Sequence, residues 1–235
     1  DWPLLAVLVP YTLLIMLSSY SVCRAMVMPA SFLVVLFYAI YLVVRNGVIS
    51  YQKASGLAMF SGIVIFCFYS FIRLKEMLPV EEYGYDAIFF ILLILCFAWG
   101  GDTCAYFAGR AFGKHKLCPV VSPKKTVEGA VGGVLGTMVF GVLVTVIYSI
   151  AADRMEEFTR SNIGVSMYVI IALLACVAAV LGIYGDLFAS VVKRQCGIKD
   201  YGTIFPGHGG ILDRFDSVMF IAPFVTMVVI AAFYD

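Results

Sequence analysis

The chain has 235 residues, of which 63% are hydrophobic and 13% are charged, and its formal net charge is +1. A soluble domain is about 45–50% apolar and about 25% charged, so this composition excludes a soluble globular enzyme, a disordered chain and a small disulfide scaffold. It predicts an all-α, polytopic integral membrane protein. The net charge itself indicates no partner, and no nucleic-acid partner is expected.

Apolar runs separated by charged breaks predict about seven transmembrane helices. In chain order these cover residues 2–20, 26–44, 56–74, 87–107, 129–150, 166–189 and 215–234. The division into regions follows from where the polar residues begin. Residues 1–86 offer only hydrophobicity and are predicted to be N-terminal transmembrane helices, whereas residues 87–235 form a second region that carries the polar loops.

The basic residues are distributed unevenly between the two predicted faces of the membrane. If all seven helices cross, the N-terminus and the loops after the second, fourth and sixth helices share one face. That face carries most of the basic residues, namely Arg45, Lys53, Arg110, Lys114, Lys116, Lys124, Lys125, Lys193, Arg194, Lys199 and Arg214. The positive-inside rule therefore predicts that this face is cytoplasmic and that the C-terminus lies on the other side.

Three polar blocks are expected at the ends of helices on this same face. They are residues 100–103, residues 122–129 and residues 185–216. Asp102 and Asp186 each lie within a few residues of a predicted helix end, in otherwise apolar sequence. A carboxylate at such a depth usually faces a polar cavity or a charged partner. We therefore expect one active site at the membrane surface.

The second block, residues 122–129, has the sequence of a helix entrance. Free backbone N–H groups at a helix start favour anions, and adjacent lysines suit a ligand rich in phosphate. The candidate binding residues of this block are Ser122, Lys124, Lys125, Thr126 and Glu128. The alternative is a membrane anchor in which the lysines contact anionic lipid.

The third block is the richest in charged side chains. It contains Asp186, Lys193, Arg194, Lys199, Asp200, His208, Asp213, Arg214 and Asp216. Paired carboxylates beside lysine and arginine are typical of phosphoryl or nucleotidyl transfer, in which the acids hold a divalent cation, usually Mg²⁺, and the bases neutralise phosphate charge. His208 by itself is better interpreted as a hydrogen-bonded loop residue.

Glycines recur through the fifth predicted helix, at positions 129, 132, 133, 136 and 141. Small residues at four-residue spacing allow close helix packing. The pattern leaves open whether the neighbouring helix belongs to the same chain or to a second copy.

The third block also carries a resemblance to a known family. The run Ser190-x2-Lys193-Arg194-x4-Lys199-Asp200-x-Gly202-x3-Pro206-x-His208-Gly209-Gly210-x2-Asp213-Arg214-x-Asp216 resembles the signature of the phosphatidate cytidylyltransferases, also called CDP-diacylglycerol synthases. Two upstream stretches, Gly101-Asp102-Thr103 with Gly109-Arg110, and residues 122–129, are similar to further blocks of this family.

The resemblance implies that CTP and phosphatidate react to give CDP-diacylglycerol and pyrophosphate with Mg²⁺, and that residues 87–235 are catalytic. It implies that Asp186, Asp213 and Asp216 hold the metal and that Lys193 and Arg214 act beside them. Substrate binding is expected from Asp102, Ser122, Lys124, Lys125, Thr126, Glu128, Arg194, Lys199, Asp200 and His208. A homodimer is also implied, and a second, monovalent cation is left open. We expect a bacterial plasma membrane, with the site facing the cytoplasm.

Two other functions are compatible with parts of this pattern. A CTP-dependent lipid kinase would use similar metal and phosphate groups but needs a hydroxyl acceptor, and the continuous match from Ser190 to Asp216 argues against it. A transporter is suggested by composition alone. Transporters place ionisable groups near the bilayer midplane, whereas here the acids cluster at one end of the predicted helices.

Overall fold

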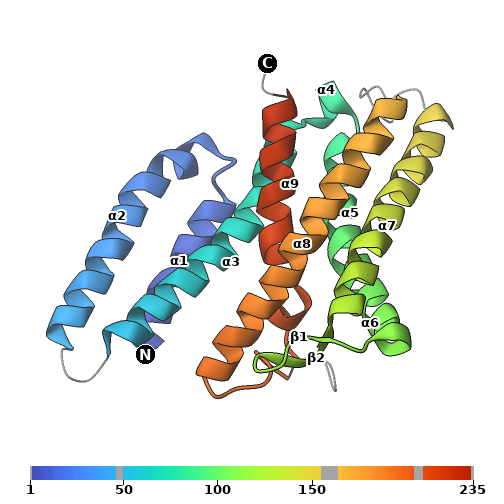
Figure 1. The fold of residues 1–235 in the computed structure, drawn as a ribbon. Coiled ribbons are helices and arrows are strands. Elements are labelled where there is room, and N and C mark those ends of the chain that lie inside the picture. Colours follow the sequence, from blue (N-terminus) through green and yellow to red (C-terminus); the bar gives the residue numbers. More distant parts are fainter. Residues whose placement is uncertain (1, 46–49, 155–163, 204–208, 234–235) are drawn as a thin grey trace. The chain divides into compact units, whose positions relative to one another are not determined.

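The computed structural model describes residues 2–45, 50–154, 164–203 and 209–233, and most of them are helical (Figure 1). The predicted all-α class is confirmed. The chain divides into two compact units, Asp1–Glu76 and Met77–Asp235. The structural boundary therefore falls before the division predicted at residue 86.

Each predicted transmembrane segment overlaps a helix. Within the described residues, five helices are long and apolar enough to cross a membrane, namely Ser21–Val44, Tyr51–Met77, Asp86–Phe112, Val127–Ala152 and Val165–Gln195. Trp2–Met16 and Val218–Phe233 are apolar but shorter. The chain is therefore an integral membrane protein, with five of the seven predicted spans supported by length and composition.

The first unit contains three helices, α1 (Trp2–Met16), α2 (Ser21–Val44) and α3 (Tyr51–Met77). A small core forms where Leu4, Tyr38 and Ala54 are buried together, and the Tyr38 hydroxyl donates a hydrogen bond to the Leu4 carbonyl at 3.4 Å. At the end of α3, Glu76 pairs with Arg73 at 2.8 Å and with Arg24 at 3.5 Å. None of the candidate site residues lies in this unit.

The second unit begins with the short helix α4 (Val80–Tyr83) and then a continuous helix over residues 86–112. Its first part, α5 (Asp86–Leu95), is apolar after Asp86, and its last part, α6 (Gly101–Phe112), is amphipathic. Between them lies one π-helical turn, η1 (Cys96–Gly100). Such turns widen a helix by one residue and are frequent at functional sites. The turn marks the change from an apolar helix to a polar one.

Helix α7 (Val127–Arg154) packs closely on α6 through its glycines. A Cβ atom at Gly133 would lie 3.0 Å from the Ala105 Cβ, and one at Gly129 would lie 2.8 Å from the Ala105 carbonyl oxygen. Gly132 and Gly136 face α6 in the same way. The partner of this glycine stripe therefore lies within the same chain, which answers the question that the sequence left open.

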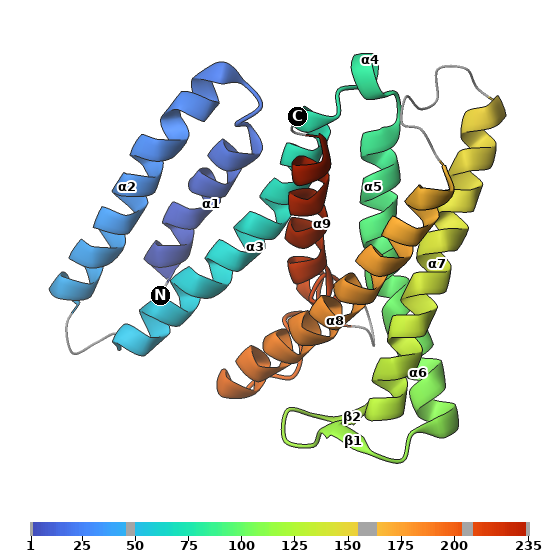
Figure 2. The same ribbon diagram turned by 45° about the horizontal axis from the view of Figure 1, so that its top comes forward.

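The remaining long helices, α8 (Val165–Gln195) and α9 (Val218–Phe233), pack against each other and are joined through the 3₁₀ turn η2 (Leu212–Arg214) (Figures 1 and 2). A Cβ atom at Gly185 would lie 2.6 Å from the Asp216 carbonyl and 3.1 Å from the Phe220 ring. This close approach brings the start of α9 beside Asp186 on α8.

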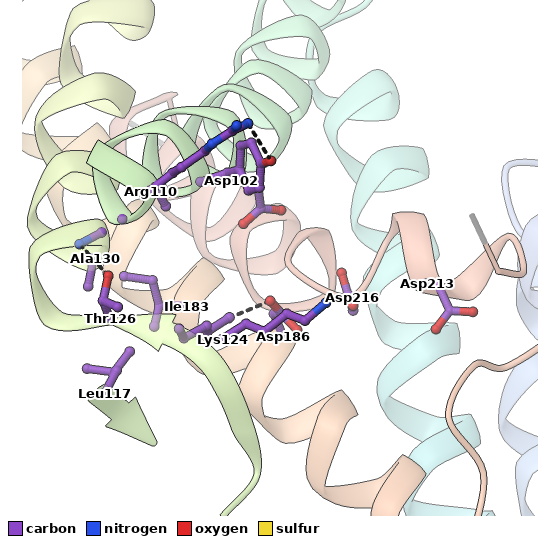
Figure 3. A pocket seen from close by; sticks show the side chains of 15 residues that line it. Asp102, Arg110, Leu117, Lys124, Thr126, Ala130, Ile183, Asp186, Asp213 and Asp216 are labelled. Atoms are coloured by element: carbon purple, nitrogen blue, oxygen red, sulfur yellow. Dashed lines mark hydrogen bonds and ion pairs between the residues drawn. The ribbon is translucent and has the colours of Figure 1, made fainter. Parts of the chain in front are cut away.

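A two-stranded antiparallel hairpin, β1 (Lys116–Cys118) and β2 (Ser122–Thr126), precedes α7. The sequence predicts a helix entrance over residues 122–129, and the structure differs by making its first half a strand. The helix itself begins at Val127, with Thr126 Oγ1 accepting a hydrogen bond from the Gly129 N–H at 3.1 Å. Lys125 of the hairpin pairs with Asp186 on α8, and Lys124 lines the same cavity as these two residues (Figure 3).

Candidate functional site

The three polar blocks meet around one cavity of about 450 Å³ in the second unit (Figure 3). Five parts of the chain line it: α6, the β1–β2 hairpin, the start of α7, α8, and the segment between α8 and α9. Its charged lining residues are Asp102, Arg110, Lys124, Lys125, Asp186, Asp213 and Asp216. The predicted convergence on one site is thus present in the fold.

Glu128, in the first turn of α7, binds the loop that joins α6 to the hairpin. This carboxylate accepts hydrogen bonds from the Lys114 N–H at 3.1 Å and from the His115 N–H at 3.2 and 3.3 Å, and it contacts His115 Nδ1 at 2.7 Å. Val127 N–H also donates to the His115 carbonyl at 2.9 Å. Glu128 therefore acts on the position of the strands, and it is not among the residues that line the cavity.

Lys125 and Asp186 form an ion pair across the cavity, between β2 and α8. Both side chains are about a quarter exposed, so water reaches the pair. Asp186 also accepts a hydrogen bond from Ser190 Oγ, one helical turn further along α8, at 3.3 Å. The ammonium group and the carboxylate are therefore positioned together at the wall of the cavity.

A second charged group joins the end of α8 to η2. Lys193 Nζ lies 2.9 Å from Asp213 Oδ1 and 3.9 Å from Asp216 Oδ2, and all three side chains are largely buried. Asp213 Oδ2 accepts hydrogen bonds from the N–H groups of Tyr201 and Gly210, each at 2.8 Å. Burial alone would raise the pKa of Asp213, but these hydrogen bonds and the ammonium charge outweigh it and lower the pKa.

Asp216 lies in a more negative environment than Asp213 does. Burial is the main cause that raises its pKa to about 7, the charges of Asp186 and Asp102 add to the effect, and Lys193 opposes it. Asp102 is held close by Ser217, whose hydroxyl donates to its Oδ2 at 2.8 Å. Three carboxylates, Asp102, Asp186 and Asp216, therefore concentrate negative charge in one region of the cavity.

A second cavity of about 520 Å³ adjoins the first. Both are lined by Asp102, Asp213 and Asp216. The other residues of the second cavity are Trp99, Thr103, Ile211, Arg214 and Phe215. Trp99 Nε1 donates a hydrogen bond to the Arg214 carbonyl at 3.0 Å, which ties the π-helical turn to η2. The three shared acids thus lie between a cavity that holds three cations and a cavity whose other lining side chains include Trp99, Ile211 and Phe215.

The carboxylates of the cavity could supply some, but not all, of the ligands of a metal ion. Among the described side chains, no three His, Cys, Asp or Glu residues are gathered tightly enough to enclose an ion. Mg²⁺, however, typically takes one or two carboxylates and obtains its other ligands from water and substrate phosphates. Asp186 and Asp216 line the cavity and are the candidates for this role. Each already has partners: Asp186 accepts from Ser190 Oγ and pairs with Lys125, and Asp216 Oδ1 accepts from the Ser217 N–H, with Oδ2 3.9 Å from Lys193. Asp213 is the most heavily engaged of the three, with hydrogen bonds to both oxygens from Lys193, Tyr201 and Gly210.

Several predicted site residues lie away from the cavity lining. Arg194, Lys199 and Asp200 are exposed at and after the end of α8, and Ser122 lies on β2 opposite Cys118. His208 falls outside the described residues. The predicted set is therefore centred on Asp102, Lys124, Lys125, Thr126, Asp186, Asp213 and Asp216, with Lys193 behind the acids and Arg214 in the second cavity.

Arg110 and Tyr106 line the cavity although neither was among the candidate site residues. Arg110 Nη1 lies 3.5 Å from the Tyr106 hydroxyl. Because Asp102, Tyr106 and Arg110 are spaced four residues apart, they share one face of α6. Once Asp102 is assigned to the site, this four-residue spacing in the sequence is sufficient to identify Tyr106 and Arg110 as further lining residues.

Fold and site together define a polytopic α-helical membrane protein with a charged cavity. A family model described as the cytidylyltransferase family matches residues 2–232, and the chain belongs to this family.

The curated relatives point to the same group. The chain is 32% identical over 191 residues to the phosphatidate cytidylyltransferase of Bacillus subtilis (strain 168), an alignment that covers 81% of this chain and 64% of the relative. It is 39% identical over 145 residues to the protein of the same name from Staphylococcus haemolyticus (strain JCSC1435), covering 62% of this chain and 50% of the relative. The chain therefore spans less than two thirds of the length of these relatives.

Proposed function

We propose that this protein transfers the cytidylyl group of CTP to phosphatidate, giving CDP-diacylglycerol and pyrophosphate. The observation that carries the proposal is that Arg110, Lys124 and Lys125 line the same cavity as Asp102, Asp186 and Asp216. Basic groups suit a polyphosphate, and the acids suit the divalent cation that accompanies it. The family and the names of the relatives support the same substrates.

In this reaction a phosphate oxygen of phosphatidate attacks the α-phosphorus of CTP. A new P–O bond forms, the bond from the α-phosphorus to the bridging oxygen of the β-phosphate breaks, and pyrophosphate leaves with the electron pair. No general base is required, because a phosphate monoester with a second pKa near 6 is already an anion at neutral pH. A hydroxyl acceptor, as in a lipid kinase, would need one.

Within this proposal, Lys124, Lys125 and Arg110 bind the phosphates of CTP and offset the charge that develops on the leaving group. Lys193 holds Asp213 and Asp216 in place. We propose Asp186 and Asp216 as ligands of Mg²⁺, which would supply charge neutralisation at the phosphates when bound. Asp213, the third metal candidate of the sequence, holds the segment around Tyr201 and Gly210 in this structure.

We further propose a bacterial plasma membrane, a site that faces the cytoplasm, and a homodimer. The basic hairpin and the end of α8 lie at the site end of the second unit, as the positive-inside rule predicts for a cytoplasmic face. A dimer would use a surface other than the glycine face of α7, because α6 occupies that face.

The decisive experiment follows the label from CTP into lipid, with purified protein in detergent, phosphatidate and Mg²⁺. Label from the α-position entering lipid, with release of pyrophosphate, is the expected result, and chelation of the metal is expected to stop it. Label from the γ-position entering lipid would overturn the proposal in favour of a kinase. Asp186→Asn is expected to lower turnover by about 100-fold or more, since it removes a charge at the reacting phosphates.

A further inference from the structure

The two adjoining cavities differ in the chemistry of their walls. Both cavities share Asp102, Asp213 and Asp216; apart from these, the described lining of the first holds three cations and one acid, Arg110, Lys124, Lys125 and Asp186, whereas that of the second holds one cation, Arg214. The remaining unshared wall of the second cavity is Trp99, Thr103, Ile211 and Phe215. A polyphosphate needs several cations, but one cation beside apolar side chains matches a lipid with a single phosphate group.

The apolar side chains of the second cavity are open to contact. Trp99 in η1 is 47% exposed and Ile211, just before η2, is 52% exposed, although both line the same cavity as the shared acids. The Trp99 ring stands edge-on to Phe215, with centroids 6.2 Å apart, and its N–H is held by the Arg214 carbonyl. A half-exposed indole with a satisfied N–H is the arrangement that tryptophan adopts at the membrane interface.

The place of Trp99 along its helix agrees with that interface. Residues before Trp99 in α5 and η1 are almost wholly apolar, and polar residues begin directly after it, with Asp102 and Thr103. The headgroup plane of a bilayer is expected where an apolar helix becomes polar. A lipid phosphate would therefore reach the cavity at the level of Trp99, without leaving the membrane.

We propose that the second cavity is the acceptor subsite, in which Arg214 pairs with the phosphate monoester of the lipid and Trp99, Ile211 and Phe215 contact its glycerol and first acyl carbons. The inference rests on the proposed function and assigns its two substrates to separate cavities. CTP then enters the cavity of Arg110, Lys124 and Lys125, and the shared acids lie where the two phosphates meet.

The chain offers a direct probe, because it has two tryptophans, Trp2 and Trp99. In the Trp2→Phe variant, Trp99 is the remaining fluorophore, and lipids brominated near the glycerol quench an indole that they touch. The variant is reconstituted in nanodiscs and titrated with brominated phosphatidate or, as the matched control, brominated phosphatidylcholine. We expect half-maximal quenching at a mole fraction roughly fivefold lower for phosphatidate, the preference that one ion pair supplies.

Two further arms sharpen the test. Arg214→Gln is expected to remove the preference, so that both lipids quench alike, while inorganic phosphate is expected to leave the quenching by phosphatidate unchanged. In the label-transfer assay, Trp99→Ala is expected to raise KM for phosphatidate by about tenfold and to leave KM for CTP within about twofold, with Lys124→Met showing the reverse.

The outcomes separate this inference from the proposed function. Equal quenching by both lipids in the presence of Arg214, while α-label still enters phosphatidate, would overturn the acceptor subsite and leave the activity intact. Selective quenching by phosphatidate without any transfer of label would support the subsite and overturn the activity.

Discussion

Lys193 balances two carboxylates in a place with little access to water. Its ammonium lies 2.9 Å from Asp213 and 3.9 Å from Asp216, and its side chain is 12% exposed. Removal of one partner from a buried ion pair leaves an uncompensated charge, which costs several kcal/mol. The stability of the segment that joins α8 to α9 therefore depends on this one side chain.

We expect Lys193→Met to lower the free energy of unfolding by about 3 kcal/mol and to abolish turnover, because both acids lose their counter-charge. Lys193→Arg is expected to recover most of the stability. Thermal unfolding in detergent measures the effect. The neighbouring Arg194→Met is the matched control for stability, since Arg194 is exposed. Equal unfolding temperatures for the wild-type protein and Lys193→Met would contradict the role of the ion pair.

At this scale the sequence predicted which residues gather but not which ones pair. Asp213 and Asp216 were expected together because they are three residues apart in the chain. The pairing of Lys125 with Asp186 had no such local signal, because it depends on where a strand passes a helix that is distant in sequence. Asp213 was predicted to hold a metal, and only the structure shows the backbone N–H groups that it binds.

Among the elements, the contact between α6 and α7 determines how Asp102 and Arg110 face the cavity. A Cβ atom at Gly132 would collide with the Cβ of Ala108. Larger side chains at such positions force the helices apart, at a cost of about 1–3 kcal/mol in a packed core.

Gly132→Val is therefore expected to destabilise the protein by about 1–3 kcal/mol and to reduce label transfer, because α6 and its site residues move. Gly62→Val on α3 is the matched control. Nothing lies within 4 Å of a Cβ atom there, so its effect is expected to be small. Thermal unfolding and the transfer assay check both variants, and equal losses at the two positions would argue against the close packing of α6 on α7.

The hairpin gives a second prediction at this scale. Glu128→Gln weakens the hydrogen bonds from the Lys114 and His115 N–H groups, so the hairpin, whose strand β2 carries Lys124 and Lys125, loses its fixed position. We expect KM for CTP to rise about tenfold, since hydrogen bonds to a charged group are worth about 1.5–3 kcal/mol, with KM for phosphatidate unchanged. Glu82→Gln, on the exposed surface of α4, serves as the control. An unchanged KM for CTP would show that the hairpin does not need Glu128.

The sequence predicted the long helices well, because apolar runs of this length have few other solutions in a membrane. It missed the hairpin, since five residues with two lysines and a proline carry no alternation of apolar and polar side chains. The π-helical turn was missed for a similar reason. Its sequence is as apolar as the helix before it, and one extra residue per turn leaves no mark in composition.

For the whole molecule, labelling can test on which side of the membrane the site lies. Cys196, at the end of α8, is exposed, whereas the other cysteines of the described chain are buried or half-buried. The site end of α8 therefore carries a natural position for chemical labelling.

We expect a membrane-impermeant maleimide to label Cys196 in inside-out vesicles and not in intact cells, because the basic loops favour the cytoplasmic face. Cys196→Ser is the control for labelling at other cysteines. A second variant in that background, Glu81→Cys, places a cysteine on α4, just before the helix over residues 86–112 and at the end of that helix away from the site. This cysteine is expected to react from outside. Labelling of Cys196 in intact cells would reverse the predicted orientation.

At this largest scale the sequence predicted the class and the family correctly, from composition and from one continuous motif. The sequence did not predict how the elements of the second unit are arranged around the site. The motif identifies residues of α8 and η2, but the acceptor side of the site comes from Trp99 in η1, which no part of the motif includes.

The π-helical turn also sets the rotational phase between α5 and α6. If the same five residues of Cys96–Gly100 wound as an ordinary α-helix, the extra residue that the wider turn accommodates would rotate α6 by about 100° about its axis. Asp102 and Arg110 would then face away from Asp186, although both halves would still be helical and equally apolar. The orientation of the site residues on α6 therefore depends on the backbone of this turn as well as on the side chains that line the cavity.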